Sequence, residues 1–187
     1  MPTFGYTSLG GGFQVIARRR GSPALGPTSF RAGRVFTLTE GGTLDSIHVG
    51  LSISFAGSAD ITAYLNNEDS AGTGSHGQVV AIERADLSVA TTSTFYTFTA
   101  SNESLTAGEI VLNALANASD LPSNSNLYDI RLRSDITTNA NVYLESNSSY
   151  VTLQESPWTE GASNSGTTYS IYATYTASTN SGFLMFM

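Results

Sequence analysis

The chain of 187 residues contains no cysteine. This absence excludes a disulfide framework, a thiolate nucleophile and a cysteine-ligated zinc site. The fold is therefore expected to be held by burial of apolar groups and by strand hydrogen bonds, with oligomerisation as a further source of stability.

Charge is scarce, at 12% of the sequence against about 25% in an ordinary domain. Lysine is absent, and all eight basic residues are arginine. Five of them lie in the first 34 residues, which contain no acid: Arg18, Arg19, Arg20, Arg31 and Arg34. The first 34 residues therefore carry +5 and the remainder −12, which together give the net charge of −7. This asymmetry favours a basic arm that pairs with an acidic protein surface, although a solvated charge cluster would have the same sequence.

Nucleic acid and membrane are not expected as partners. Three consecutive arginines neutralise few phosphates, and the acidic remainder opposes approach to DNA. No stretch of the sequence has the length of a transmembrane helix, and the first ten residues lack the apolar run of a signal peptide. We therefore expect a protein without an export signal of its own.

Residue patterns typical of catalysis and metal binding are missing too. His48 and His76 are the two histidines, and neither has a metal-ligand partner two or four residues away. The sequence has no nucleophile elbow, no zinc-protease helix motif and no phosphate-binding loop. The oxygen-rich residues 66–70 do not match a calcium loop and are interpreted as a polar turn. We predict no enzyme activity, no cofactor and no metal site.

Alternating apolar and polar residues dominate what is present. Over residues 44–55, the side chains of Ile47, Val49, Leu51, Ile53 and Phe55 alternate with small or polar ones, which is typical of a half-buried strand. Further strands are expected at residues 61–65, 95–98, 109–115, 127–133, 141–144, 150–153 and 169–175. Turn-forming clusters between them predict an all-β, jelly-roll-like antiparallel sandwich.

Three regions follow from this pattern. Residues 1–34 are rich in Gly, Pro and Arg and are expected to form an extended arm. Residues 35–177 are expected to form the β-sandwich domain. Residues 178–187 form a tail that ends in five apolar residues, expected either to fold back on the sandwich or to dock on a neighbour.

Aromatic residues with adjacent polar groups offer a second kind of contact. Trp158, the one tryptophan, is the candidate glycan-binding residue, because an exposed indole stacks on a sugar ring. Strand parity predicts that Tyr64, Tyr143 and Tyr172 also point outward. Aromatic side chains that close the end of a sandwich or fill a subunit interface are the alternative.

Four segments together carry a resemblance to a known group of modules. They are residues 4–11 (FGYTSLGG), 34–49 (RVFTLTEGGTLDSIHV), 95–112 with its FYTF and LTAGEIVL runs, and 170–176 (SIYATYT). Their order resembles jelly-roll modules of tailed-phage virion proteins and carbohydrate-binding-like extracellular modules. The Arg-rich insertion and the apolar tail depart from that pattern and are similar to the extra arms of capsid decoration (cement) proteins.

The resemblance implies a structural virion protein on the phage head surface. As a capsid decoration protein, the chain would bridge subunits of the major capsid protein, and its self-association would be a homotrimer. The residues expected to contact the partner are Phe13, Val15, Ile16, Arg18, Arg19, Arg20, Phe183, Leu184 and Phe186. The alternatives are a carbohydrate-binding adhesin module of a tail or fibre, and another tail or vertex component.

Overall fold

The computed structural model describes residues 1–23, 25–68, 75–136, 142–147, 150, 153, 158–159 and 167–178. The elements are β1 Thr3–Gly5, β2 Gly12–Arg20, β3 Leu25–Leu38, β4 Gly42–Ile53, β5 Gly57–Glu68, β6 Ser75–Val89, β7 Thr94–Leu105, β8 Gly108–Ala116, the 3-10 helix η1 Ala118–Asp120, β9 Tyr128–Ile136, β10 Val142–Asn147, β11 Trp158–Thr159, β12 Thr167–Tyr169 and β13 Ile171–Ala177. The chain is all-β, as predicted.

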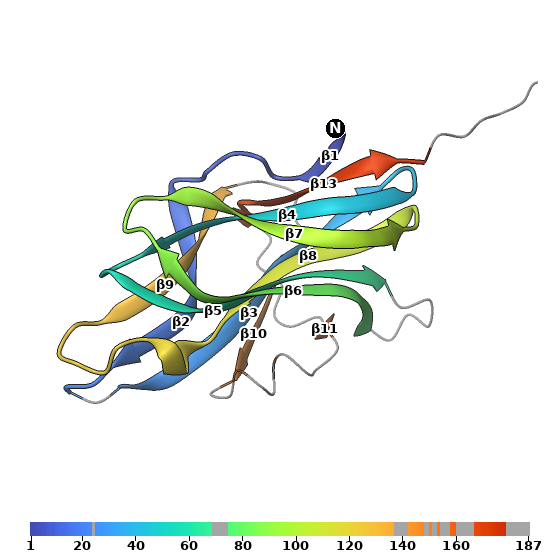
Figure 1. Cartoon of the computed structure of the whole chain (residues 1–187). Helices are drawn as coiled ribbons and strands as arrows, with labels where there is room; N and C mark the ends of the chain where they lie inside the picture. The colour runs from blue at the N-terminus through green and yellow to red at the C-terminus, as the bar shows by residue number, and fades with distance from the viewer. Residues whose placement is uncertain are drawn as a thin grey trace, which may run out of the picture.

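Antiparallel pairing joins these strands in the order β1-β13-β4-β9-β2-β3-β8-β5-β6-β11. Three further strands attach to this path: β7 pairs with β4, β10 with β3, and β12 with β9. β1 and β13 lie together on one side of the molecule, and β11 lies beside β6 on the other (Figure 1). The fold is a β-sandwich, because the inward faces of these strands pack against one another.

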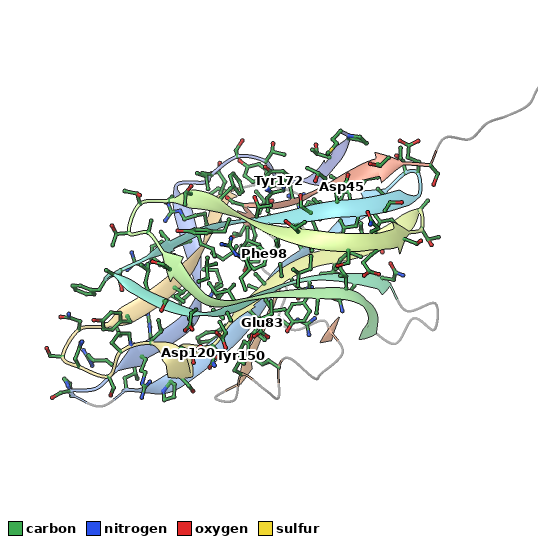
Figure 2. All side chains as sticks on the ribbon, in the orientation of Figure 1. Asp45, Glu83, Phe98, Asp120, Tyr150 and Tyr172 are labelled. Carbon is green, nitrogen blue, oxygen red and sulfur yellow. The ribbon has the colours of Figure 1, made fainter. Side chains whose placement is uncertain are left out.

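The alternation predicted for residues 44–55 is confirmed for its apolar positions as far as Ile53, whereas Phe55 lies beyond β4 and is 44% exposed. Ile47, Val49, Leu51 and Ile53 are at most 2% exposed, and they belong to one core cluster with residues of β5, β8, β9 and β13. Phe98 of β7 is fully buried in the same cluster (Figure 2). Because β4 contributes to this interior along its whole length, its outward side chains form a regular row on the opposite face.

Residues 1–34 are placed differently from the predicted arm. β2 pairs with β9 on one side and with β3 on the other, and β3 pairs in turn with β8. Residues 21–23, which we interpreted as part of an irregular arm, lie in the turn between β2 and β3. Gly21 and Pro23 thus mark a turn between two strands, whereas Gly26, Pro27 and Gly33 lie within β3. The arginines lie within β2 and β3.

Two smaller expectations also change. Tyr150 and Leu153, the described residues of the strand expected at 150–153, are helical and buried. β6, Ser75–Val89, lies where no strand was expected, and Asp86 within it has a φ of 48°. Within the described part of the chain, the structure has no helix long and apolar enough to cross a membrane.

Candidate functional site

Ser46, His48, Gly50 and Ser52 are the positions of β4 that alternate with the core residues; His48 is partly exposed, whereas Ser46 and Ser52 are 8% and 4% exposed. On one side, the register of β13 places Tyr172 opposite His48 and Thr174 opposite Ser46. On the other side, β7 places Thr97 opposite His48 and Phe95 opposite Gly50. These rows form an outer face of β13, β4 and β7, which we call the ladder face.

Aromatic rings meet at the centre of the ladder face. The imidazole of His48 stacks on the ring of Tyr172, with 4.4 Å between ring centroids and an interplanar angle of 9°. Phe95 meets the same tyrosine edge-on, with centroids 5.1 Å apart. All three side chains are partly exposed, so the cluster lies at the surface (Figure 2 labels Tyr172). Such a stacked and edge-on arrangement fixes the orientation of the rings.

Gly50 makes room for Leu9 and Ser170 next to β4. A Cβ at Gly50 would lie 2.8 Å from Cδ2 of Leu9 and 2.8 Å from Cβ of Ser170. The segment that carries Leu9 crosses the face here, and the amide of Gly10 donates to Oγ of Ser170 at 3.0 Å. Leu9 remains 41% exposed, which adds an apolar side chain over Gly50, the register partner of Phe95.

Polar groups line the ladder face next to the rings. Oγ1 of Thr97 lies 3.1 Å from Nδ1 of His48, and Oγ of Ser46 lies 2.8 Å from Nε2. Oγ of Ser46 is also 2.7 Å from Oγ1 of Thr174. The four side chains therefore form one hydrogen-bonded relay across three strands, in which each hydroxyl is able to donate or to accept.

His48 is held in its neutral form by this environment. Partial burial lowers the pKa of His48 below its usual value of 6.5, because desolvation disfavours the imidazolium. A neutral ring donates through one nitrogen and accepts through the other, which suits two hydroxyl partners. The ladder face is consequently polar and uncharged at its centre.

The outer side of Tyr172 borders a glycine. Gly5 of β1 is the register partner of Tyr172, and its φ is 112°. A Cβ there would lie 2.5 Å from the carbonyl oxygen of Ile171 and 2.9 Å from Cβ of Tyr172. The position therefore requires glycine, and no side chain from this register position covers the tyrosine ring.

The same surface continues from β4 onto β9 and β2. Ser52 pairs with Arg131, which places that arginine on the side of the sheet that carries His48. Arg133 shares the parity of Arg131, and β2 places Val15 and Phe13 opposite these two arginines. Phe13 is 47% exposed, and its ring centroid lies 4.4 Å from the guanidinium carbon of Arg131.

The three consecutive arginines predicted to contact a partner instead make contacts within the chain. Arg18 forms two hydrogen bonds to Asp129, at 2.6 and 2.9 Å. Arg19 donates to the carbonyl oxygens of Ser119 and Leu121, so it fastens β2 to η1. Arg20 donates to the carbonyl oxygen of Pro23 within its own turn.

The apolar residues of that prediction separate into three groups. Phe13 and Val15 lie on the outer face, where a partner has access to them. Ile16 is fully buried in the core and is not available for a contact. Phe183, Leu184 and Phe186 lie outside the described residues.

The aromatic residues predicted to point outward have different surroundings. Tyr172 is on the ladder face as predicted. Tyr64 is fully buried instead, because Tyr150 and Leu153 pack over it. The backbone of Trp158 belongs to β11, paired with β6 far from β13 in the strand order, and its side chain lies outside the described ones, as does that of Tyr143.

A buried polar cluster explains why Tyr64 is covered. Arg31 is fully buried and donates to Oδ1 of Asn113 at 2.6 Å and to Oδ1 of Asn66 at 3.2 Å. Its guanidinium carbon lies 4.2 Å from the ring centroid of Tyr64. Asn66, considered as a calcium ligand, is therefore engaged inside the fold. The described residues contain no group of three or more His, Asp or Glu that would suit a metal ion.

Sequence reasoning placed Tyr172 and His48 on the polar side of their strands but did not bring them together. It also missed Phe95, Leu9 and Arg131 as members of one surface. The sequence did show that positions 48, 50 and 52 alternate with the core residues of β4 and therefore share one face of the strand. The partners of those positions come from β7, β9 and β13, and strand pairing alone reveals them.

Comparisons with known proteins add little to this geometry. No family model matches the chain, and no curated protein matches it significantly. One solved structure that matches in part contains the cysteine protease and lectin-like domains of Cwp84, a surface layer associated protein of Clostridium difficile. It is 12% identical with a TM-score of 0.48, and the match covers 79% of this chain and 32% of that chain. A likeness at this level carries no argument about function.

Proposed function

We propose that this chain is a binding module that holds a carbohydrate on the ladder face. The observation that carries the proposal is the stack of Tyr172 on His48, with Phe95 edge-on beside it, next to a relay of hydroxyl groups. The C–H bonds of a sugar ring pack against the negative face of an aromatic ring. The hydroxyls of a sugar donate and accept, as do Ser46 and Thr97.

The uncharged character of the face favours a sugar over a charged protein surface. His48 is neutral, and its hydrogen-bond partners in the described structure are hydroxyl groups. An apolar protein contact would leave the relay without water, and burial of polar groups without partners costs about 1–3 kcal/mol for each group. A carbohydrate replaces those water contacts with its own hydroxyls.

The test is direct binding of the full chain to an array of neutral and acidic oligosaccharides, followed by calorimetric titration of the ligands found. The proposal expects saturable binding of at least one oligosaccharide, and loss of that binding when Phe95 is changed to Ala. A change of Phe55 to Ala is the matched control, because this aromatic residue is 44% exposed and contacts Tyr128 away from the ladder face. Absence of binding to every oligosaccharide would overturn the proposal.

Capsid decoration, with the major capsid protein as partner and a trimer as the assembly, remains a prediction from the resemblance. Of the residues expected to make that contact, Arg18, Arg19 and Arg20 are engaged within the chain and Ile16 is buried. The present proposal agrees with the alternative drawn from the sequence, which is a carbohydrate-binding adhesin module of a tail or fibre.

A further inference from the structure

Arg131 has a guanidinium group that the fold holds in place without using its hydrogen bonds. Its Nε is buried and has no hydrogen-bond partner, and none of its five N–H donors bonds to the described residues. Its nearest carboxylate oxygen is Oδ2 of Asp129, 3.9 Å from Nη2. The side chain is 30% exposed and lies over the ring of Phe13. Stacking on Phe13 therefore orients a charged fork on a side chain that is partly exposed.

The neighbouring carboxylates are occupied by other groups. Asp129 is 4% exposed and accepts both of its short hydrogen bonds from Arg18. Asp135 accepts from the hydroxyl of Tyr6 at 2.8 Å. Arg133 donates to the carbonyl oxygens of Gly10 and Gly11, which are neutral and leave its charge in place. The Tyr6 hydroxyl is likewise neutral and leaves the charge of Asp135 in place, so Arg131 and Arg133 outnumber the one uncompensated carboxylate of this group, on a chain with a net charge of −7.

The arginine lies on the same face as the aromatic stack. Ser52, the register partner of Arg131, is four residues along β4 from His48, which corresponds to about 13 Å along the strand. Leu9, 41% exposed, lies over Gly50 between the two points. A single sugar ring does not span this distance, whereas an oligosaccharide that stacks on Tyr172 and passes over Leu9 reaches Arg131.

From this arrangement we infer that the carbohydrate bound by the ladder face carries a carboxylate, as a uronic acid does, and that Arg131 receives it. This inference rests on the proposed function of the same face. The planar guanidinium matches a carboxylate with two parallel hydrogen bonds, which adds geometric selectivity to charge attraction. Arg133, two residues further along β9, adds a second positive charge on the same face. An acidic protein segment would be attracted to the same arginines, but it has no use for the aromatic rings and the hydroxyl relay.

The experiment compares pairs of ligands that differ only in the carboxylate. Each uronate-bearing oligosaccharide on the array is matched with its carboxyl-reduced form, in which the acid has become a hydroxymethyl group. Binding of the full chain is titrated for each pair, for Arg131→Met and for Arg20→Met. The second variant is the matched control, because it removes the same charge from a side chain that bonds only to its own turn in the described structure. Polyglutamate serves as an acidic polymer without sugar rings.

The inference expects the uronate forms to bind roughly 10- to 100-fold more tightly than the reduced forms. Arg131→Met is expected to remove this difference, and Arg20→Met to keep it. Equal affinity for both forms would overturn the inference while leaving the proposed function intact. Absence of binding to both forms, while neutral oligosaccharides bind, would overturn the inference alone, and absence of binding to every oligosaccharide would overturn the proposed function. Polyglutamate binding that Arg131→Met removes, without binding of any oligosaccharide, would overturn both, and would indicate docking of an acidic protein.

Discussion

The imidazole of His48 and the phenol ring of Tyr172 lie parallel, 4.4 Å apart, across the pairing of β4 with β13. Neither ring belongs to the core cluster, and both are partly exposed. The stack is a cross-strand aromatic pair on the outer face of a sandwich, and the proposed binding function depends on it.

Tyr172→Ala is expected to weaken carbohydrate binding at least tenfold, because it removes the ring on which a sugar would stack. A tenfold change corresponds to about 1.4 kcal/mol. The fold should survive, since the stack itself contributes only about 1 kcal/mol to stability. Calorimetric titration measures the affinity, and a denaturation curve checks the fold. A variant that keeps full affinity would show that the tyrosine is not part of the site.

Gly50→Ala is expected to displace the segment that crosses the ladder face at Leu9. The added Cβ would lie 2.8 Å from Leu9 and from Ser170, so the segment that crosses the face must shift. We expect a loss of stability of about 1–3 kcal/mol together with weaker binding. Gly11→Ala, where a Cβ meets nothing within 4 Å, is the control and should change neither. Equal denaturation midpoints for the two variants would contradict the packing described here.

The lowered pKa of His48 predicts a dependence of stability on pH. Because the folded state binds this proton less readily than the unfolded state, unfolding is favoured as the pH falls through about 6.5 toward the folded pKa. The contribution of His48 to stability is complete above pH 6.5 and is lost below the folded pKa. Urea denaturation of the wild type and of His48→Gln at several pH values isolates the contribution of His48 to the free energy of unfolding. The stability difference between the two proteins should shift in favour of the variant at acid pH; a constant difference would contradict the assignment.

Arg31→Met is expected to destabilise the fold by about 3 kcal/mol. The change removes the donor to Oδ1 of Asn113 and one donor to Oδ1 of Asn66, both in fully buried side chains. Loss of one partner from a buried polar cluster leaves the others desolvated and unsatisfied. Arg20→Met, at a partly exposed side chain in the β2–β3 turn, should change the free energy of unfolding by less than about 0.5 kcal/mol. Similar losses of unfolding free energy in Arg31→Met and Arg20→Met would show that the buried contacts of Arg31 do not stabilise the fold.

The sequence predicted the strands whose two faces differ. Apolar residues alternate with small or polar residues along β4, and the outward positions of His48 and Tyr172 followed from that parity, although Ser46, Gly50 and Ser52 on the same row are buried. β2 and β3 were missed because Gly, Pro and Arg are uncommon inside strands. Their arginines are tolerated since Arg18 meets Asp129, 111 positions away, and Arg31 meets Asn113, 82 positions away. Partners at such separations depend on strand order, which no local pattern contains.

The central claim is that a carbohydrate binds on the outer face of β13, β4 and β7. Chemical-shift mapping by NMR, with the array-selected oligosaccharide titrated into isotope-labelled protein, tests it most directly. The account predicts that the largest shifts fall on the amides and side chains of Tyr172, His48, Phe95 and Thr97, and spread toward Arg131. Saturable shifts confined to β5, β6 or β11, with the ladder face unchanged, would contradict it.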